Sequence, residues 1–342
     1  MSTSIIVITG LSALQFWLDV SARANPNSFS FTRCERIPLP GKYRLITNPD
    51  IIKTVASDLG LNLPLNMFAP DDSSRHAARS VRLSLLPGNL PNNSFIKLQD
   101  RQLPSRLREM KIDIYVASPE LCFLLFAGRL SFVRLIELGC NLCAGYAHSS
   151  SSDFKQIFRK PITNASMLSD YIAVAERIPG CKKARRAIRF IYDSSNSPIE
   201  TKLAVIFALP YSEGGYNLPG FCMNERIVLS EAAAASLGID SCLCDIVWND
   251  EHAVVEYDSN LTHLDKGQHG YDKAKANALS DSGYRLVTIT SSNIKSFEAM
   301  ENTYEMVRNA LCKRKRPKLL SKNVLRRRKV FNELFVFDIK MF

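Results

Sequence analysis

The chain has 342 residues, of which 46% are hydrophobic and 23% are charged. This composition is typical of a globular protein and argues against a disordered chain, and the length predicts about two domains. The net charge of +11 is concentrated near the C-terminus, because residues 313–329 hold ten Lys and Arg and no acid. The rest of the chain carries only +1, so the sequence assigns the excess of positive charge to a C-terminal tail and not to the folded domains.

The cysteine pattern and the hydropathy give an expected location. The nine cysteines are scattered and odd in number, which is not the pattern of a secreted disulfide framework. The apolar start SIIVITGL lacks the basic segment of a signal peptide, and no run approaches the roughly 18 apolar residues of a membrane span. We therefore expect a cytoplasmic protein with no membrane span.

The first 147 residues alternate short apolar runs with clusters of Pro, Asn, Asp and Ser, a pattern typical of strands separated by turns. Strands are expected at KYRLIT, VRLSLL and FIKLQD, followed by a strand that leads into an apolar helix starting at Ser118-Pro119. Helices are also expected at 11–22 and 131–146. This pattern predicts a small α+β domain over residues 1–147, which would recognise DNA or a protein partner.

Residues 148–196 begin with a Ser-rich stretch and are predicted to be a linker with helical segments. The helix near 180–192 carries five basic residues, with small and apolar residues between them. These basic residues fit two interpretations equally well, a solvated helix face and a face that contacts phosphates. The five are Lys182, Lys183, Arg185, Arg186 and Arg189.

A second domain is predicted over residues 197–312. Its first helix starts at Ser197-Pro198 and runs to Leu209, and the next element is a strand around 227–229. A hairpin over 242–258 follows, and a helix, a strand and a closing helix are expected at 271–282, 284–290 and 297–311. The order α-β-β-β-α-β-α predicts a compact domain with a mixed sheet, and residues 313–342 form the basic tail.

The hairpin brings carboxylates together. The polar turn of residues 249–252 sets Trp248 opposite Ala253, and this register places Asp245 opposite Glu256. Opposed side chains lie roughly 4.5–5.5 Å apart at Cβ, where like charges destabilise the pair. Asp258 follows on the same strand face as Glu256. A hard divalent cation, Mg²⁺ or Mn²⁺, would explain these three acids, which are the predicted metal ligands.

Three further residues are candidates for catalysis, each with an ordinary alternative. Glu200 is placed to reach the acidic hairpin from the preceding helix, and it equally completes a capping box with Ser197. His263 follows the acidic strand and is suited to activate water or protonate a leaving oxygen, or else it is a solvated loop residue. Lys275 would balance developing negative charge, or else it is an exposed helix lysine.

The segments SPIETKLA, CDIVW, VVEYDSNLTH and KANALSDSGYRLVTIT together resemble the PD-(D/E)XK nuclease superfamily over residues 197–292. The most similar branch is the domain of unknown function 559, which is related to the very-short-patch-repair (Vsr-like) endonucleases. The resemblance implies a restriction-endonuclease-like core and metal-dependent DNA cleavage. It places Glu200, Asp245 and Glu256 on the family's acidic positions and His263 on the histidine that follows EYD.

Two positions depart from the general motif. Asp258 stands where the superfamily carries a lysine, although the branch also has an acid there, and Lys275 stands where the branch more often has an arginine. An arginine would allow bidentate phosphate contact, which a lysine does not. The first half of the chain resembles the N-terminal region of proteins that join an AbiEi-like module to such a domain.

The sequence therefore predicts a Mg²⁺- or Mn²⁺-dependent DNA endonuclease or nickase. The alternative is a non-catalytic DNA-binding regulator of the antitoxin type that retains the nuclease fold. The basic tail is expected to contact phosphates without sequence preference. Its contacting residues would be Lys313, Arg314, Lys315, Arg316, Arg326, Arg327, Arg328 and Lys329. The alternatives are a disordered solubilising tail and a tail whose apolar ending, VFNELFVFDIKMF, docks on the fold or on a membrane surface.

Overall fold

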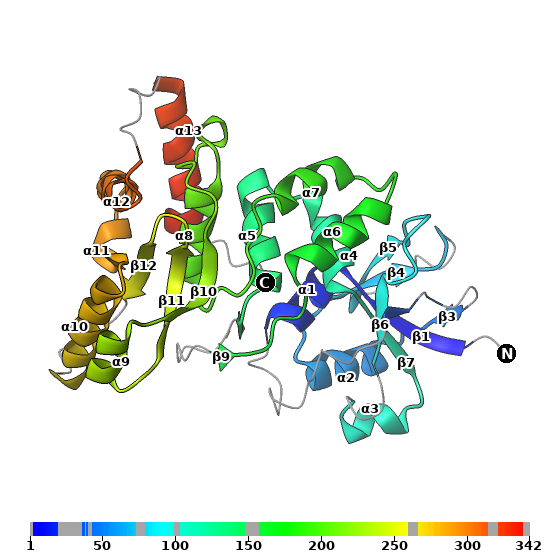
Figure 1. Ribbon diagram of the computed structural model, residues 1–342. Helices are drawn as coiled ribbons and strands as arrows, with labels where there is room; N and C mark the ends of the chain where they lie inside the picture. The colour runs from blue at the N-terminus through cyan, green and yellow to red at the C-terminus, as the bar shows by residue number, and fades with distance from the viewer. Residues whose placement is uncertain are drawn as a thin grey trace. The chain divides into compact units, whose positions relative to one another are not determined.

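The computed structural model describes residues 3–19, 36–37, 39, 43–72, 79–98, 103–147, 157–258, 266–313 and 321–337. The chain divides into two compact units (Figure 1). Unit 1 comprises residues 1–189 with 340–342, and unit 2 comprises residues 190–339. Both units combine helices with mixed sheets, as the predicted α+β class requires.

Unit 1 is built on a seven-stranded mixed sheet of order β2-β6-β7-β1-β4-β5, with β3 also paired to β1. The central strand β1 runs parallel to β7 and β3, and its buried apolar residues explain its position between other strands. The strands are β1 (Thr3–Ile8), β2 (Arg36–Ile37), β3 (Tyr43–Leu45), β4 (Leu65–Ala69), β5 (Val81–Leu85), β6 (Phe95–Lys97) and β7 (Asp113–Ala117).

Helices pack against this sheet through long apolar side chains. In α1 (Gly10–Leu18), the Trp17 indole is buried and donates to the Ala117 carbonyl at 2.8 Å. The helix α4 (Pro119–Ala127) begins at the predicted Ser118-Pro119 and is buried almost throughout. The remaining helices of this region are α2 (Pro49–Leu59), α3 (Ser105–Glu109) and α5 (Phe132–Leu142).

The predicted domain boundary near residue 147 and the predicted linker over 148–196 are wrong. Strand β8 (Tyr146–Ala147) pairs with β9 (Ile157–Phe158), and α6 (Ala165–Val174) and α7 (Cys181–Ile188) pack on α4. The reason is burial: each of these helices has an apolar stripe that lies in the core of unit 1. The first domain therefore continues to Arg189.

Unit 2 holds a four-stranded sheet of order β10-β11-β12-β13. The first three strands are antiparallel neighbours, and β13 runs parallel to β12, since helix α10 connects them. The strands are β10 (Cys222–Val228), β11 (Ser241–Trp248), β12 (Ala253–Asp258) and β13 (Arg285–Thr290). The helices are α8 (Pro198–Ala208), η5 (Tyr211–Glu213), α9 (Glu231–Leu237), α10 (Lys266–Asp281), α11 (Ser291–Ile294) and α12 (Phe297–Ala310).

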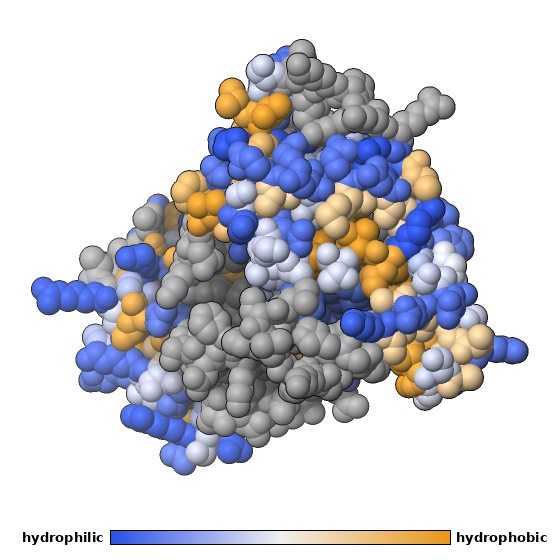
Figure 2. Space-filling model, turned by 90° about the vertical axis from the view of Figure 1, so that its left-hand side faces the viewer, coloured by the Kyte–Doolittle hydropathy of each residue, from blue (hydrophilic) through white to orange (hydrophobic). Residues whose placement is uncertain are grey.

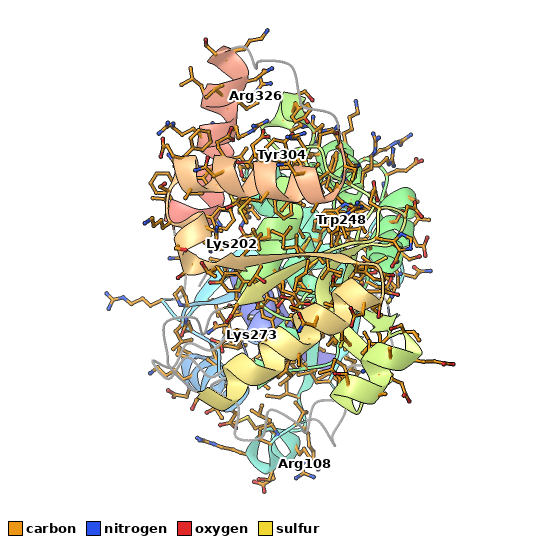
Figure 3. The ribbon with its side chains drawn as sticks, turned by 60° about the vertical axis from the view of Figure 1, so that its left-hand side comes forward. Arg108, Lys202, Trp248, Lys273, Tyr304 and Arg326 are labelled. Carbon is orange, nitrogen blue, oxygen red and sulfur yellow. The ribbon has the colours of Figure 1, made fainter. Side chains whose placement is uncertain are left out.

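Helices cover both faces of this sheet. On one face, residues of α9 and α10 join the strands in a core cluster that includes Val247 and Leu279. On the other, the ring of Trp248 meets Phe207 of α8, with centroids 6.2 Å apart. Figure 3 shows the sheet between α10, marked by Lys273, and α12, marked by Tyr304. The element order α-β-β-β-α-β-α is confirmed, with α9 and α11 as short additional helices.

The described part of the basic tail, residues 321–337, is not a separate segment. Helix α13 (Ser321–Phe331), followed by the π-helical turn η6 (Asn332–Val336), belongs to unit 2 and buries Val330, Phe331 and Leu334. The assignment of the positive charge to a tail outside the fold was therefore wrong for residues 321–337. Apolar positions between the basic ones explain this result, because they give α13 a buried face.

None of the helices in the described part of the chain combines the length and the apolarity that a transmembrane segment needs. The face in Figure 2 carries hydrophilic side chains with smaller apolar groups between them.

Candidate functional site

The predicted hairpin register is confirmed where the strands pair. Trp248 lies opposite Ala253, and Ile246 lies opposite Val255. Continuing this register by one residue places Asp245 across from Glu256. At that point the backbone pairing gives way to a side chain, because the Tyr257 N–H donates to Asp245 Oδ2 at 2.7 Å. The two strands therefore remain joined at the site through a carboxylate.

Asp245 lies half-buried among other acids. Burial raises the pKa of its carboxyl to about 8, and Glu256 and Glu200 add to this increase. The hydrogen bond from Tyr257 and the charge of Lys275 lower the pKa but do not offset the other effects. Without a cation, the folded protein therefore holds a proton on this cluster of acids near neutral pH.

Glu256 is paired with Lys275 of α10. The Lys275 ammonium donates to Glu256 Oε1 at 3.0 Å and to the Leu243 carbonyl at 2.8 Å. Burial lowers the pKa of this ammonium, but the Glu256 carboxylate outweighs burial, and the pKa is raised above its usual value. Lys275 is therefore a fixed positive charge within the site and not the exposed helix lysine of the alternative interpretation.

Glu200 enters the site from the first turn of α8, where it is 6% exposed. Its backbone N–H donates to Ser197 Oγ at 3.2 Å, which confirms half of the predicted capping box. The other half differs, since Glu200 Oε2 accepts from the Asn196 N–H at 2.8 Å and from Asn224 Nδ2 at 2.7 Å. Burial raises the pKa of this carboxyl.

The site thus combines three carboxylates, those of Glu200, Asp245 and Glu256, with one ammonium. Such hard oxygen donors suit Mg²⁺ or Mn²⁺. The described residues do not contain a group of three or more His, Cys, Asp or Glu side chains placed together as metal ligands. Burial, with the neighbouring Glu256, raises the pKa of the adjacent Cys244 thiol, so this thiol does not supply a thiolate.

Two predicted site residues remain, Asp258 and His263. Asp258 ends β12 and pairs with Thr290 of β13. Burial raises the pKa of the neighbouring Tyr257, and the negative charge of Asp258 adds to this increase. His263 lies outside the described residues.

The basic residues of α7 form an exposed helix face with contacts inside unit 1. The Arg186 guanidinium lies 4.0 Å from the centroid of the Phe132 ring, and Lys183 Nζ donates to the Leu130 carbonyl. Arg185 reaches the Ile172 carbonyl at 3.5 Å, while Lys182 and Arg189 are exposed.

Among the basic residues of the C-terminal region, Arg327 was wrongly predicted to contact nucleic acid. Its side chain is 1% exposed, its guanidinium pairs with Glu301 at 3.1 Å, and three tyrosine rings lie around the guanidinium. Arg328 pairs with Glu298 at 2.9 Å, and Lys313 pairs with Glu251 at 3.1 Å. Arg326 donates to the Ser212 carbonyl, Lys329 is exposed, and Arg314, Lys315 and Arg316 lie outside the described residues.

Sequence reasoning missed Asn196 and Asn224, which hold the Glu200 carboxylate. Asn224 has a positive φ of 48° inside β10, a conformation that Asn adopts more readily than most residues. An Asn within a strand was the available signal, because Asn is depleted in strands.

No family model, curated protein or solved structure matches this chain.

Proposed function

We propose that this chain is a Mg²⁺- or Mn²⁺-dependent DNA endonuclease or nickase. The observation that carries the proposal is the meeting of Asp245 and Glu256 across β11 and β12, with Lys275 bonded to Glu256 and Glu200 close by. A scaffold has no need for this arrangement, because clustered acids cost stability unless a cation or a proton neutralises them.

The topology of unit 2 supports the finer fold assignment. An antiparallel β10-β11-β12 sheet follows α8, and β13 lies parallel to β12 after the α10 crossover. This order is the one expected of a restriction-endonuclease-like core. In such a core the acids sit on the central hairpin, as Asp245 and Glu256 do here.

The donor set fits a magnesium ion. Mg²⁺ in proteins typically takes one or two carboxylates and completes its shell with waters and substrate phosphates, so Asp245 and Glu256 would suffice as protein ligands. When bound, the cation would polarise the phosphoryl oxygen and lower the pKa of the attacking water. Glu200 would then be the acid available to accept a proton from water.

Lys275 supplies the positive charge that the superfamily motif places on the strand, at the position of Asp258. Its ammonium holds Glu256 in place and is already desolvated in part, with 18% of its side chain exposed. A fixed cation in such an environment stabilises charge that develops on a phosphate without further reorganisation. DNA is the proposed substrate, and unit 1 is the proposed recognition unit for DNA or a protein partner.

One observation favours the alternative, a non-catalytic DNA-binding regulator of the antitoxin type. The described residues lack an assembled group of three or more metal-ligating side chains. In this alternative, Lys275 and a retained proton would neutralise the acids permanently.

A plasmid-nicking assay with Mn²⁺ separates the two functions. Lys275→Met is expected to lower the nicking rate about 100-fold, the usual effect of removing one charge-stabilising donor. The matched control is Lys273→Met, which alters an exposed lysine on the same helix and should nick at the wild-type rate. Absence of metal-dependent nicking by the wild-type protein would favour the regulator.

A further inference from the structure

Asn224 makes a complete set of hydrogen bonds around Glu200. Its Nδ2 donates to Glu200 Oε2 at 2.7 Å and to the Ser194 carbonyl at 2.9 Å, while its Oδ1 accepts from Asn196 Nδ2. The orientation of the amide is fixed by these partners, because a flipped amide would aim its oxygen at two other acceptors. The Asn224 amide is therefore used for hydrogen bonds within the protein and is not available as a metal ligand.

The place of Asn224 in the sheet connects it to the hairpin. Met223 pairs with Ile246 and Glu225 pairs with Cys244, so Asn224 lies across from Asp245, where no backbone pair forms. Its left-handed backbone, with φ of 48°, coincides with this gap in the pairing of β10 with β11. Only a few residue types tolerate this conformation, and Asn is prominent among them.

An amide is suited to hold a carboxylate that must remain charged. It donates hydrogen bonds to Glu200 without the neutralising charge of Lys or Arg, and both donors that hold the carboxylate, Asn196 N–H and Asn224 Nδ2, meet the same oxygen. Hydrogen bonds to the charged form favour that form and restrict its rotation.

We propose that Asn224 is a positioning residue, which holds the Glu200 carboxylate in the orientation required for metal-dependent cleavage. This inference rests on the proposed function for its catalytic part. The contact between Asn224 and Glu200 can be tested with or without activity.

Asn224→Asp keeps the shape and the tolerance for positive φ, but it replaces the donor to Glu200 with a second acceptor. Asn217→Asp is a matched control, because Asn217 also has a positive φ, of 54°, and is exposed in unit 2. In urea unfolding without metal at pH 8, Asn224→Asp should lower the midpoint, and Asn217→Asp should leave it unchanged.

The same change in a Glu200→Gln background tests the contact itself, since a glutamine amide donates to the new aspartate. In the Glu200→Gln background, Asn224→Asp should lower the urea midpoint much less than it does in the wild type. An equal decrease of the midpoint in both backgrounds would overturn the proposed contact. If Asn224→Asp does not fold, Asn224→Gly takes its place, because glycine accepts the backbone conformation and removes the donor. The glycine change should likewise lower the midpoint less in the Glu200→Gln background.

Cleavage then tests the role. Asn224→Asp should lower kcat about 100-fold, the scale of a catalytic group displaced by about 1 Å, with KM for DNA roughly unchanged. If the urea experiments show that Asn224 and Glu200 interact but Asn224→Asp cleaves with the wild-type kcat, the positioning role is overturned. An inactive wild-type protein would instead refute the proposed function, while the urea cycle would still decide the contact.

Discussion

Asp245 is the residue whose charge the fold disfavours most clearly among the described carboxyl groups. It would be ionised in water near neutral pH, yet burial and two neighbouring acids hold its pKa at about 8. A cation at the proposed site would lower the pKa of Asp245, because a positive charge favours the ionised form of each carboxylate ligand. The raised pKa makes the metal-free protein sensitive to pH.

We predict that the metal-free protein loses stability as the pH rises from 5 to 8. The unfolded Asp245 releases its proton near its ordinary pKa of 3.8, while the folded one keeps it until about 8. Between these values the folded state binds more protons, so each pH unit lowers the free energy of unfolding by up to about 1.4 kcal/mol.

Thermal melts at several pH values check this prediction. Asp245→Asn should show a shallower fall of Tm with pH, because it cannot titrate. Asp250→Asn, in the exposed turn of the same hairpin, should follow the wild type. Parallel slopes for all three proteins would show that Asp245 is not the titrating group.

At the residue scale, the sequence predicted the acids but not their supports. Asp245 and Glu256 follow from the period of two along strands and from the four-residue turn, which are local features. The contact between Glu200 and Asn224 does not follow from local features, because Asn224 lies 24 residues later in the sequence and reaches Glu200 only through the packing of β10 beside α8. Lys275 was identified as a candidate, but only the structure shows that it pairs with Glu256.

At the scale of elements, strong local sequence signals correctly predicted where two helices begin. The Ser197-Pro198 and Ser118-Pro119 pairs do begin α8 and α4, since a Ser cap and a first-turn Pro are local preferences. The short α9 was missed despite Ser230 before it and Gly238 after it. Helix α13 was missed for a different reason: ten basic residues in a short span indicate a solvated tail unless the partners for the buried ones are known.

Arg327 anchors α13 to unit 2. Its guanidinium lies 4.5 Å from the centroid of Tyr216, with Tyr211 and Tyr304 further out, and it donates to the Gly215 carbonyl at 3.2 Å. Such a desolvated cation is stabilised by aromatic faces and by its acidic partner Glu301.

We predict that Arg327→Ala destabilises unit 2 by about 3 kcal/mol, since it removes one member of a largely buried pair. Lys329→Ala, at an exposed position of the same helix, should change stability by less than about 0.5 kcal/mol. Urea unfolding followed by tryptophan fluorescence measures both. Equal effects of the two changes would mean that α13 is not held through Arg327.

At the scale of the whole molecule, the two units have separate cores and separate sheets. The sequence predicted two α+β domains but ended the first one about 40 residues too early, because the apolar stripes of α6 and α7 are short and lie among polar residues. Such stripes indicate a helix, but they do not show which core it joins. Membership in unit 1 is a property of the tertiary packing.

We propose that the acids of unit 2 form a cation site. Isothermal titration calorimetry with Mn²⁺, on the intact chain, measures it without reference to DNA or to cleavage. Asp245→Asn keeps the shape of the site and removes one charged ligand, and Asp250→Asn serves as the matched control in the same hairpin. We predict that the wild type and Asp250→Asn bind Mn²⁺ with release of protons, and that Asp245→Asn binds at least about tenfold more weakly. Equal Mn²⁺ affinity in all three proteins, or no binding by the wild type, would contradict the claim.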